Sequence, residues 1–195
     1  MNYKAAIQAV DYIIQNTSDY DILDKLSILK LLFFAERYSL RKFAQSITDD
    51  NFCAMRCGPV ASKTYDLISF KDTLKNIEKE YSKEILSKDG SYGVKSNKLL
   101  ITRNDYDELS DSDIESLDFS IKNYGKFSSK ELINITHNFK EWNRFKNELE
   151  QNDTSIKIDI NDFFEKTTKG TKEYSVISNE HVEQSKELFT CGDFK

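Results

Sequence analysis

DKLSILKLLFFAERYSLRKF, residues 24–43, is the stretch that decides the fold. Its apolar residues recur every three or four positions, and further apolar residues extend the apolar surface around most of the helix. A helix that is apolar nearly all round belongs in a core, with other elements on several sides. Asp24 is a typical N-cap residue, so we expect a buried helix from Asp24 to Phe43.

The rest of the chain predicts more helices and one small β element. Amphipathic patterns and capping residues predict further helices over Tyr3–Asn16, Asp72–Ile85, Asp113–Tyr124, Ser128–His137, Trp142–Leu149 and Ser178–Phe189, with one turn in Ile160–Lys166. Turn residues around Gly90 and Gly93 predict a hairpin within Ser87–Thr102. We therefore predict a mainly α (α+β) fold, a compact helical domain with a small β-hairpin.

The segment after the central helix contains the only proline of the chain, Pro59. The mostly apolar stretch Phe52–Cys57 is expected to be extended, and Gly58 is free to take a positive φ. Proline is tolerated at the first helical position, so we expect a helix from Pro59 to about Phe70. Gly58 and Pro59, followed by Val60, are assigned to architecture rather than to contact with a partner.

Composition limits the class of protein. The chain has 195 residues, 38% hydrophobic and 31% charged, and a net charge of −5, which is typical of one globular domain. This charge does not predict a nucleic-acid partner. No signal peptide is expected, and the longest apolar run, residues 31–35, is too short to span a membrane. Three cysteines imply no disulfide framework, so we expect a cytoplasmic protein.

The sequence offers few catalytic or metal-binding patterns. Cys53 and Cys57 have a spacing that zinc sites use, but they need further ligands, and the alternative is two small buried side chains. His137, at a predicted helix end near Trp142, fits a structural role better than a catalytic one, because no second catalytic group is identifiable. The six glycines are scattered singly and form no phosphate-binding loop. We therefore expect no enzyme, no cofactor and no metal.

A polar stretch lies late in the central helix. It contains Arg37, Tyr38, Arg41 and Lys42, and together with Lys30 it fits the lining of a concave face. Arginine is enriched in binding hot spots, which favours a role in partner binding. The alternative is a solvated face whose long side chains lie over apolar surface.

Several segments, in order, resemble one protein family. Residues 27–38 resemble the helix that carries a Lys-Leu-Leu-Tyr-Phe-Ala signature in the Panacea domain, the family of SocA-like antitoxins and GepA-like phage-associated proteins. Phe52–Met55 and Gly58–Val60 are similar to the family's next motifs, with Tyr65 at the expected place. The likeness continues through residues 113–142 to Ile160–Phe164, although Phe33 replaces a frequent tyrosine and the spacing of Asp162 and Phe163 is one residue short.

The resemblance implies a domain over residues 1–166 and a function in toxin neutralisation. Residues 167–195 have no family counterpart and are expected to form a C-terminal extension, a linker plus a short helix. The resemblance implies that the partner is a cognate protein toxin, encoded next to this protein in a bacterium or phage. For the contact we single out side chains that we expect to be exposed near the helix end and the Gly-Pro-Val turn: Arg37, Arg41, Lys63 and Tyr65.

Three hypotheses remain open on the sequence. The first is an antitoxin that binds and blocks its toxin. The second is an adaptor that delivers a toxin or another client to a cellular protease, with the C-terminal extension as the docking element, or a phage-associated regulatory binding protein. The third is an enzyme or nucleic-acid binder of an unrecognised kind, which the missing catalytic pattern and the acidic charge disfavour.

Overall fold

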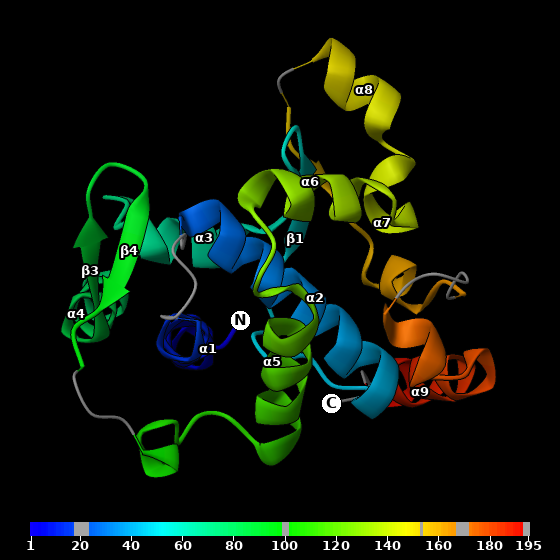
Figure 1. Cartoon of the computed structure of the whole chain (residues 1–195), viewed down its shortest axis with the longest axis horizontal. Coiled ribbons are helices and arrows are strands. Elements are labelled where there is room, and N and C mark those ends of the chain that lie inside the picture. The colour runs from blue at the N-terminus through cyan, green and yellow to red at the C-terminus, as the bar shows by residue number, and fades with distance from the viewer. Residues whose placement is uncertain (18–23, 99–101, 153, 167–171, 193–195) are drawn as a thin grey trace.

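The helix α2 (Lys25–Phe43) forms the centre of the molecule (Figure 1). Asp24 caps it by accepting a hydrogen bond from the backbone N–H of Ser27 at 2.7 Å, and Ala44, with a φ of 54°, is the C-cap that follows Phe43. Fifteen of its 19 residues, from Ser27 to Arg41, are buried against the surrounding helices and a small sheet. The prediction of a buried central helix is confirmed.

The computed structural model describes residues 1–17, 24–98, 102–152, 154–166 and 172–192. The predicted mainly α fold is confirmed, and the predicted helix over Trp142–Leu149 is observed as two short ones. The other α-helices are α1 (Tyr3–Asn16), α3 (Ser62–Ile68), α4 (Asn76–Ile85), α5 (Asp111–Tyr124), α6 (Ser129–His137), α7 (Lys140–Asn143), α8 (Lys146–Gln151) and α9 (Asn179–Gly192). Three single 3₁₀ turns are η1 (Arg103–Asp105), η2 (Ile160–Phe164) and η3 (Lys172–Ser175).

Two small antiparallel sheets complete the described part of the chain. One has the order β2-β1-β5, formed by β1 (Phe52–Met55), β2 (Gly58–Ala61) and β5 (Ile156–Lys157). The other is the hairpin of β3 (Leu86–Asp89) and β4 (Gly93–Ser96), which confirms the predicted hairpin. The strand residues expected at 99–101 lie outside the described residues.

The prediction that Pro59 begins a helix is wrong. Pro59 lies inside β2, opposite Ala54 of β1, and the helix begins three residues later at Ser62. β2 is an edge strand, where a residue without an N–H is tolerated because one side of the strand need not join the ladder. The start of α3 is fixed instead by Asp50, whose carboxylate accepts hydrogen bonds from the backbone N–H groups of Lys63 and Thr64.

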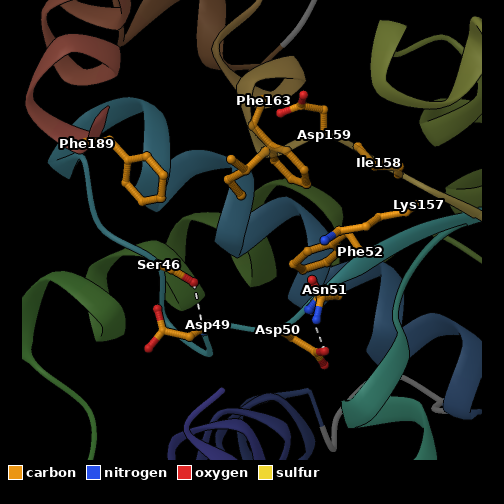
Figure 2. A pocket seen from close by; sticks show the side chains of 11 residues that line it. Ser46, Asp49, Asp50, Asn51, Phe52, Lys157, Ile158, Asp159, Phe163 and Phe189 are labelled. Carbon is orange, nitrogen blue, oxygen red and sulfur yellow. Dashed lines mark hydrogen bonds between the residues drawn. The ribbon is translucent and has the colours of Figure 1, made fainter. Parts of the chain in front are cut away.

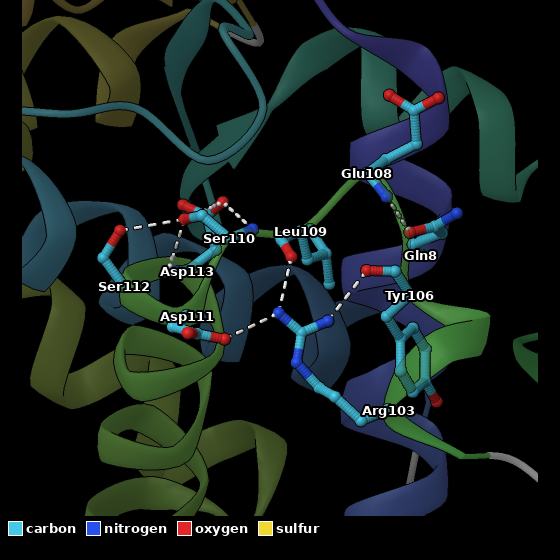
Figure 3. Close-up of polar contacts among 9 residues, drawn as sticks. All are labelled: Gln8, Arg103, Tyr106, Glu108, Leu109, Ser110, Asp111, Ser112 and Asp113. Carbon is cyan, nitrogen blue, oxygen red and sulfur yellow. Dashed lines mark hydrogen bonds and ion pairs between the residues drawn. The ribbon is translucent and has the colours of Figure 1, made fainter.

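A polar network holds the segment before α5 in place (Figure 3). Arg103 donates to the carbonyl oxygens of Tyr106 at 3.0 Å and Leu109 at 2.8 Å, and to Asp111 at 3.0 Å. Ser110 and Asp113 cap α5 reciprocally, with each side chain bonded to the other residue's backbone N–H. These reciprocal bonds form a capping box at the start of α5.

The C-terminal helix α9 packs on the second half of α2. Val182 is buried, His181 Nε2 donates to the Lys42 carbonyl at 2.8 Å, and the rings of Phe164 and Phe189 are 5.6 Å apart. The predicted terminal helix is confirmed, whereas the linker predicted at 167–171 lies outside the described residues. In Figure 1, α9 and the β3–β4 hairpin lie on opposite sides of the molecule.

Candidate partner-binding surface

Arg37 and Arg41, expected to be exposed, are buried in the C-terminal half of α2. Arg37 Nε donates to Glu141 of α7 at 2.6 Å, and its Nη1 pairs with Glu173 of η3. Arg41 Nε lies 3.2 Å from the same Glu173 carboxylate. The expectation of exposure is wrong because α2 is covered on this side too, and carboxylates from segments distant in sequence compensate its guanidinium groups.

The two guanidinium groups respond to burial in different ways. Burial alone would lower the pKa of Arg37, but the carboxylates of Glu141 and Glu173 outweigh it and raise that pKa. Burial and the neighbouring Arg37 lower the pKa of Arg41 to about 10. Arg41 also donates to the carbonyl oxygens of Phe163 and Glu165, at 2.6 and 2.7 Å. We call Arg37, Arg41, Glu141 and Glu173 the arginine cluster, and it ties η2 and η3 to α2.

Lys30 is also buried, so the expectation that it lines a concave face is wrong. Its Nζ donates to the Pro59 carbonyl at 2.7 Å, and burial lowers its pKa to about 7. Gly58, with a φ of 99°, packs so closely that a Cβ there would lie 2.7 Å from both Lys30 Nζ and Thr136 Oγ1. Only glycine fits this backbone and this space, which agrees with an architectural role for Gly58, Pro59 and the buried Val60.

His137 and Trp142 lie beside the same turn. Their rings stack with centroids 3.5 Å apart and an angle of 3° between planes, and Trp142 Nε1 donates to the Met55 carbonyl at 2.7 Å. Burial, and then the charge of Lys30, lower the pKa of His137. The pair packs α6 and α7 against the end of β1, as a structural role requires.

Tyr65 lies at an open groove beside the N-terminal end of α2. The groove has a volume of about 580 Å³, and its floor is apolar, formed by Leu26 and Leu29 of α2, Met55 of β1 and Val60 of β2. We call this hollow the α2–β2 groove. Of the four residues predicted to bind a partner, only Tyr65 lines it, with 37% of its surface exposed. Lys63, also on α3, does not line the groove and pairs with Glu78 at 3.1 Å.

Three further residues that line the groove were not predicted from the sequence. Tyr92, at the tip of the β3–β4 hairpin, is 81% exposed, and the positions of Lys25 and Arg56 add positive charge. Tyr92 lies between Gly90 and Gly93 in a predicted turn, and a large aromatic side chain exposed in a turn is a feature that could have identified it as a candidate contact residue. The position of the hairpin tip beside α2 has no such local signal, because it depends on the hydrogen bond from Lys25 N–H to the Tyr92 carbonyl, 3.0 Å long.

A second hollow of about 580 Å³ lies between the loop after α2, β5 and α9 (Figure 2). Asp50 at this hollow is committed to α3, and Ser46 donates to Glu36 at 3.1 Å. Burial raises the pKa of Glu36 to about 7, although this carboxyl group also accepts hydrogen bonds from Ile47 N and Thr48 N. These polar groups hold the loop onto α2, so this hollow is a junction between elements of the fold.

The cysteines do not share one environment. Cys57 is exposed and lines the α2–β2 groove, Cys53 is half-buried, and Cys191 is exposed on α9, so the expectation that Cys57 is buried is wrong. Within the described ranges, no group of three or more His, Cys, Asp or Glu side chains is arranged to hold a metal ion. Among the helices described, none combines the length and the apolar character needed to cross a membrane.

Comparison with known proteins gives one match. Residues 28–143, more than half of the chain, match the family described as antitoxin SocA-like, Panacea domain. The matched region runs from α2 to α7 and contains Tyr65 and Glu141, but not Glu173 or α9. Searches of curated proteins and of solved structures give no match. The chain belongs to the SocA-like antitoxin family that is defined by the Panacea domain.

Proposed function

We propose that this protein is the antitoxin of a toxin–antitoxin system and neutralises a cognate toxin by direct contact, without catalysis. The observation that carries the proposal is the family match over residues 28–143, since that family is named for its antitoxins. We place the protein in the cytoplasm of a bacterium, in a gene pair carried by the chromosome or by a phage. The toxin is then the product of an adjacent gene.

The shape of the molecule supports a binding function. The α2–β2 groove combines an apolar floor with two exposed tyrosines, a composition typical of surfaces that bind proteins. The elements around it are held by internal hydrogen bonds, such as Lys30 Nζ to Pro59 O and Trp142 Nε1 to Met55 O. A surface that is already ordered loses less entropy on binding.

Co-expression with the product of the adjacent gene tests the proposal. We expect that induction of the neighbour alone stops growth, that co-expression of this protein restores it, and that the two proteins purify together. The control is the same toxin with an empty second vector. If this protein neither rescues growth nor co-purifies with the product of either adjacent gene, the antitoxin assignment is wrong.

Stoichiometry separates direct blocking from the alternatives. Direct contact predicts that neutralisation in a purified assay saturates near a fixed molar ratio of the two proteins. Neutralisation by far less than one equivalent would indicate catalysis and contradict the proposal. Growth rescue accompanied by a protease-dependent fall in toxin level would instead identify an adaptor, the second hypothesis from the sequence.

A further inference from the structure

We propose that the α2–β2 groove is the contact site for the toxin, and that its occupant is an apolar protein segment flanked by carboxylates. This inference rests on the proposed function and adds the location of the contact and the chemistry of the segment bound. Three observations carry it: the shape and apolar character of the groove, two cations at the groove that pair with no carboxylate among the described residues, and the internal bonds that fix its walls.

The apolar floor determines what can enter the groove. Leu26, Leu29, Met55 and Val60 line a hollow of about 580 Å³, a size suited to a few side chains of a partner. Tyr65 and Tyr92 also line it, and tyrosine contributes large contact area at a small cost in side-chain entropy. Burial of this surface therefore favours apolar side chains in the occupant.

The charge of the groove selects the residues that flank those apolar side chains. Lys25 and Arg56 line it, and neither forms an ion pair with another residue in the part of the chain that the structure describes. Asp24 is the only carboxylate among the lining residues, and it is committed to Ser27 N and Ser129 Oγ, at 2.7 and 2.8 Å. Among the described residues the groove therefore carries a positive charge that no carboxylate balances, on a chain of net charge −5, and carboxylates on the partner would complement it.

Elsewhere on the surface, arginines are compensated within the chain. Arg103 pairs with Asp111 at 3.0 Å, and Arg144 pairs with Asp162. Among the arginines, Arg56 at the groove differs in that it forms no ion pair with a described residue. Two cations over an apolar floor suit a protein segment better than a nucleic acid, whose phosphates require a more extended basic surface.

The walls of the groove hold their positions without a partner. Lys25 N donates to Tyr92 O at 3.0 Å, and Asp24 forms an isolated β-bridge with Gly93, so the hairpin tip is fixed to the start of α2. On the other side, Trp142 Nε1 holds the Met55 carbonyl at 2.7 Å. The groove is therefore preorganised for its occupant.

Alanine substitutions of the two tyrosines test the site. We expect the variant with Tyr65→Ala and Tyr92→Ala to bind the tagged product of the adjacent gene at least about tenfold more weakly, with an unchanged melting temperature, because both rings are exposed. The matched control carries Ile77→Ala and Leu188→Ala, two exposed apolar residues that do not line the groove, and should bind within about twofold of wild type.

Charge reversal tests the chemistry of the occupant. We expect Lys25→Glu with Arg56→Glu to slow association with the toxin at least about tenfold at low salt, with a smaller effect at high salt. The matched control reverses two exposed lysines that do not line the groove, Lys122→Glu with Lys146→Glu. Unchanged association would overturn the acidic-segment proposal. The proposal would also be overturned if the wild-type protein bound a fluorescent RNA and the charge reversal abolished RNA binding without changing association with the toxin.

Cys57 provides an independent readout, since it is exposed and lines the groove. We expect its labelling by a biotin maleimide, followed by mass spectrometry, to slow at least about tenfold in the purified complex. Cys191 on α9 is the internal reference. Equal labelling of Cys57 in the free protein and the complex would place the contact elsewhere. If Cys57 is labelled equally but the wild-type protein still binds and neutralises the toxin, only the location of the contact is wrong. If the wild-type protein neither binds the toxin nor rescues growth, the proposed antitoxin function itself is wrong.

Discussion

The C-terminal half of α2 buries Arg37 and Arg41 among carboxylates, whereas its N-terminal end presents Lys25 at an open groove with no carboxylate partner in the described chain. Both ends belong to one helix with the same pattern of apolar residues. The difference is in what the rest of the fold supplies. At one end Glu141 and Glu173 complete the contacts, so the charges hold the fold together. At the other end no described carboxylate pairs with Lys25, and we propose that its charge serves contact with a second molecule.

The largest effect is expected in the arginine cluster. Arg37→Ala leaves Glu141 and Glu173 buried with one cation fewer, and we expect a loss of about 3–5 kcal/mol in the free energy of unfolding. Chemical denaturation measures it. Lys140→Ala, which removes one partner of the exposed ion pair with Glu165, is the control and should cost about 1 kcal/mol or less. A loss below about 1 kcal/mol for Arg37→Ala would show that the two ends of α2 do not differ in this way.

The next effect is a pH dependence at Lys30. Its pKa is about 7 in the folded protein and 10.5 as an ordinary lysine, so above pH 7 the unfolded chain binds more protons and stability rises with pH. Between pH 7 and 9.5 we expect a contribution on the order of 3 kcal/mol in the wild type, which Lys30→Met lacks.

The measurement is the free energy of unfolding at several pH values for both proteins. Lys146→Met controls for the loss of an exposed lysine. Equal slopes in wild type and Lys30→Met would contradict a neutral, buried Lys30.

A smaller effect is expected at the turn between β1 and β2, which packs on Lys30 in the middle of α2. Gly58→Ala combines a strained φ of 99° with a close contact to Lys30 and Thr136, and should cost about 1–3 kcal/mol. Gly90→Ala is the matched control, because it has a φ of 60° but open space around it. A Gly58→Ala protein with unchanged melting temperature and lost toxin binding would show that Gly58 acts in contact and not in architecture.

The smallest effect on stability is expected at Lys63. Its ion pair with Glu78 is partly exposed, so Lys63→Ala should cost less than about 1 kcal/mol by denaturation. Because Lys63 does not line the α2–β2 groove, we also expect toxin affinity within about twofold of wild type. A larger loss of affinity with normal stability would extend the contact surface along α3, where the sequence had placed it.

Local patterns were sufficient for much of the fold. α1 has the predicted bounds, and α2 follows its predicted cap, because apolar periodicity and capping depend on neighbours within a few residues. The prediction that Pro59 begins a helix was wrong because it used local information alone. Proline fits a first helical turn and an edge strand equally well, and only pairing with β1 decides between them.

The candidate site was predictable only in part. Tyr65 was predicted from its position beside the Gly-Pro-Val turn. Tyr92 lines the groove because its carbonyl accepts a hydrogen bond from the backbone N–H of Lys25, which lies 67 residues away in the sequence. The burial of Arg37 depends on Glu141 and Glu173, which are 104 and 136 residues distant. No pattern in the sequence around Arg37 predicts that these two carboxylates will lie beside it.

The amino-acid sequence by itself determined that residues 24–43 form the core helix, that Gly58 is free to take a positive φ, and which family the protein resembles. These properties follow from periodicity, backbone freedom and ordered motifs, all of which act over short stretches. The tertiary structure alone decided which cations of that helix pair with a described carboxylate and which do not. Compensation is a long-range property, because a buried charge is stabilised by whichever carboxylate the fold brings within a few ångströms.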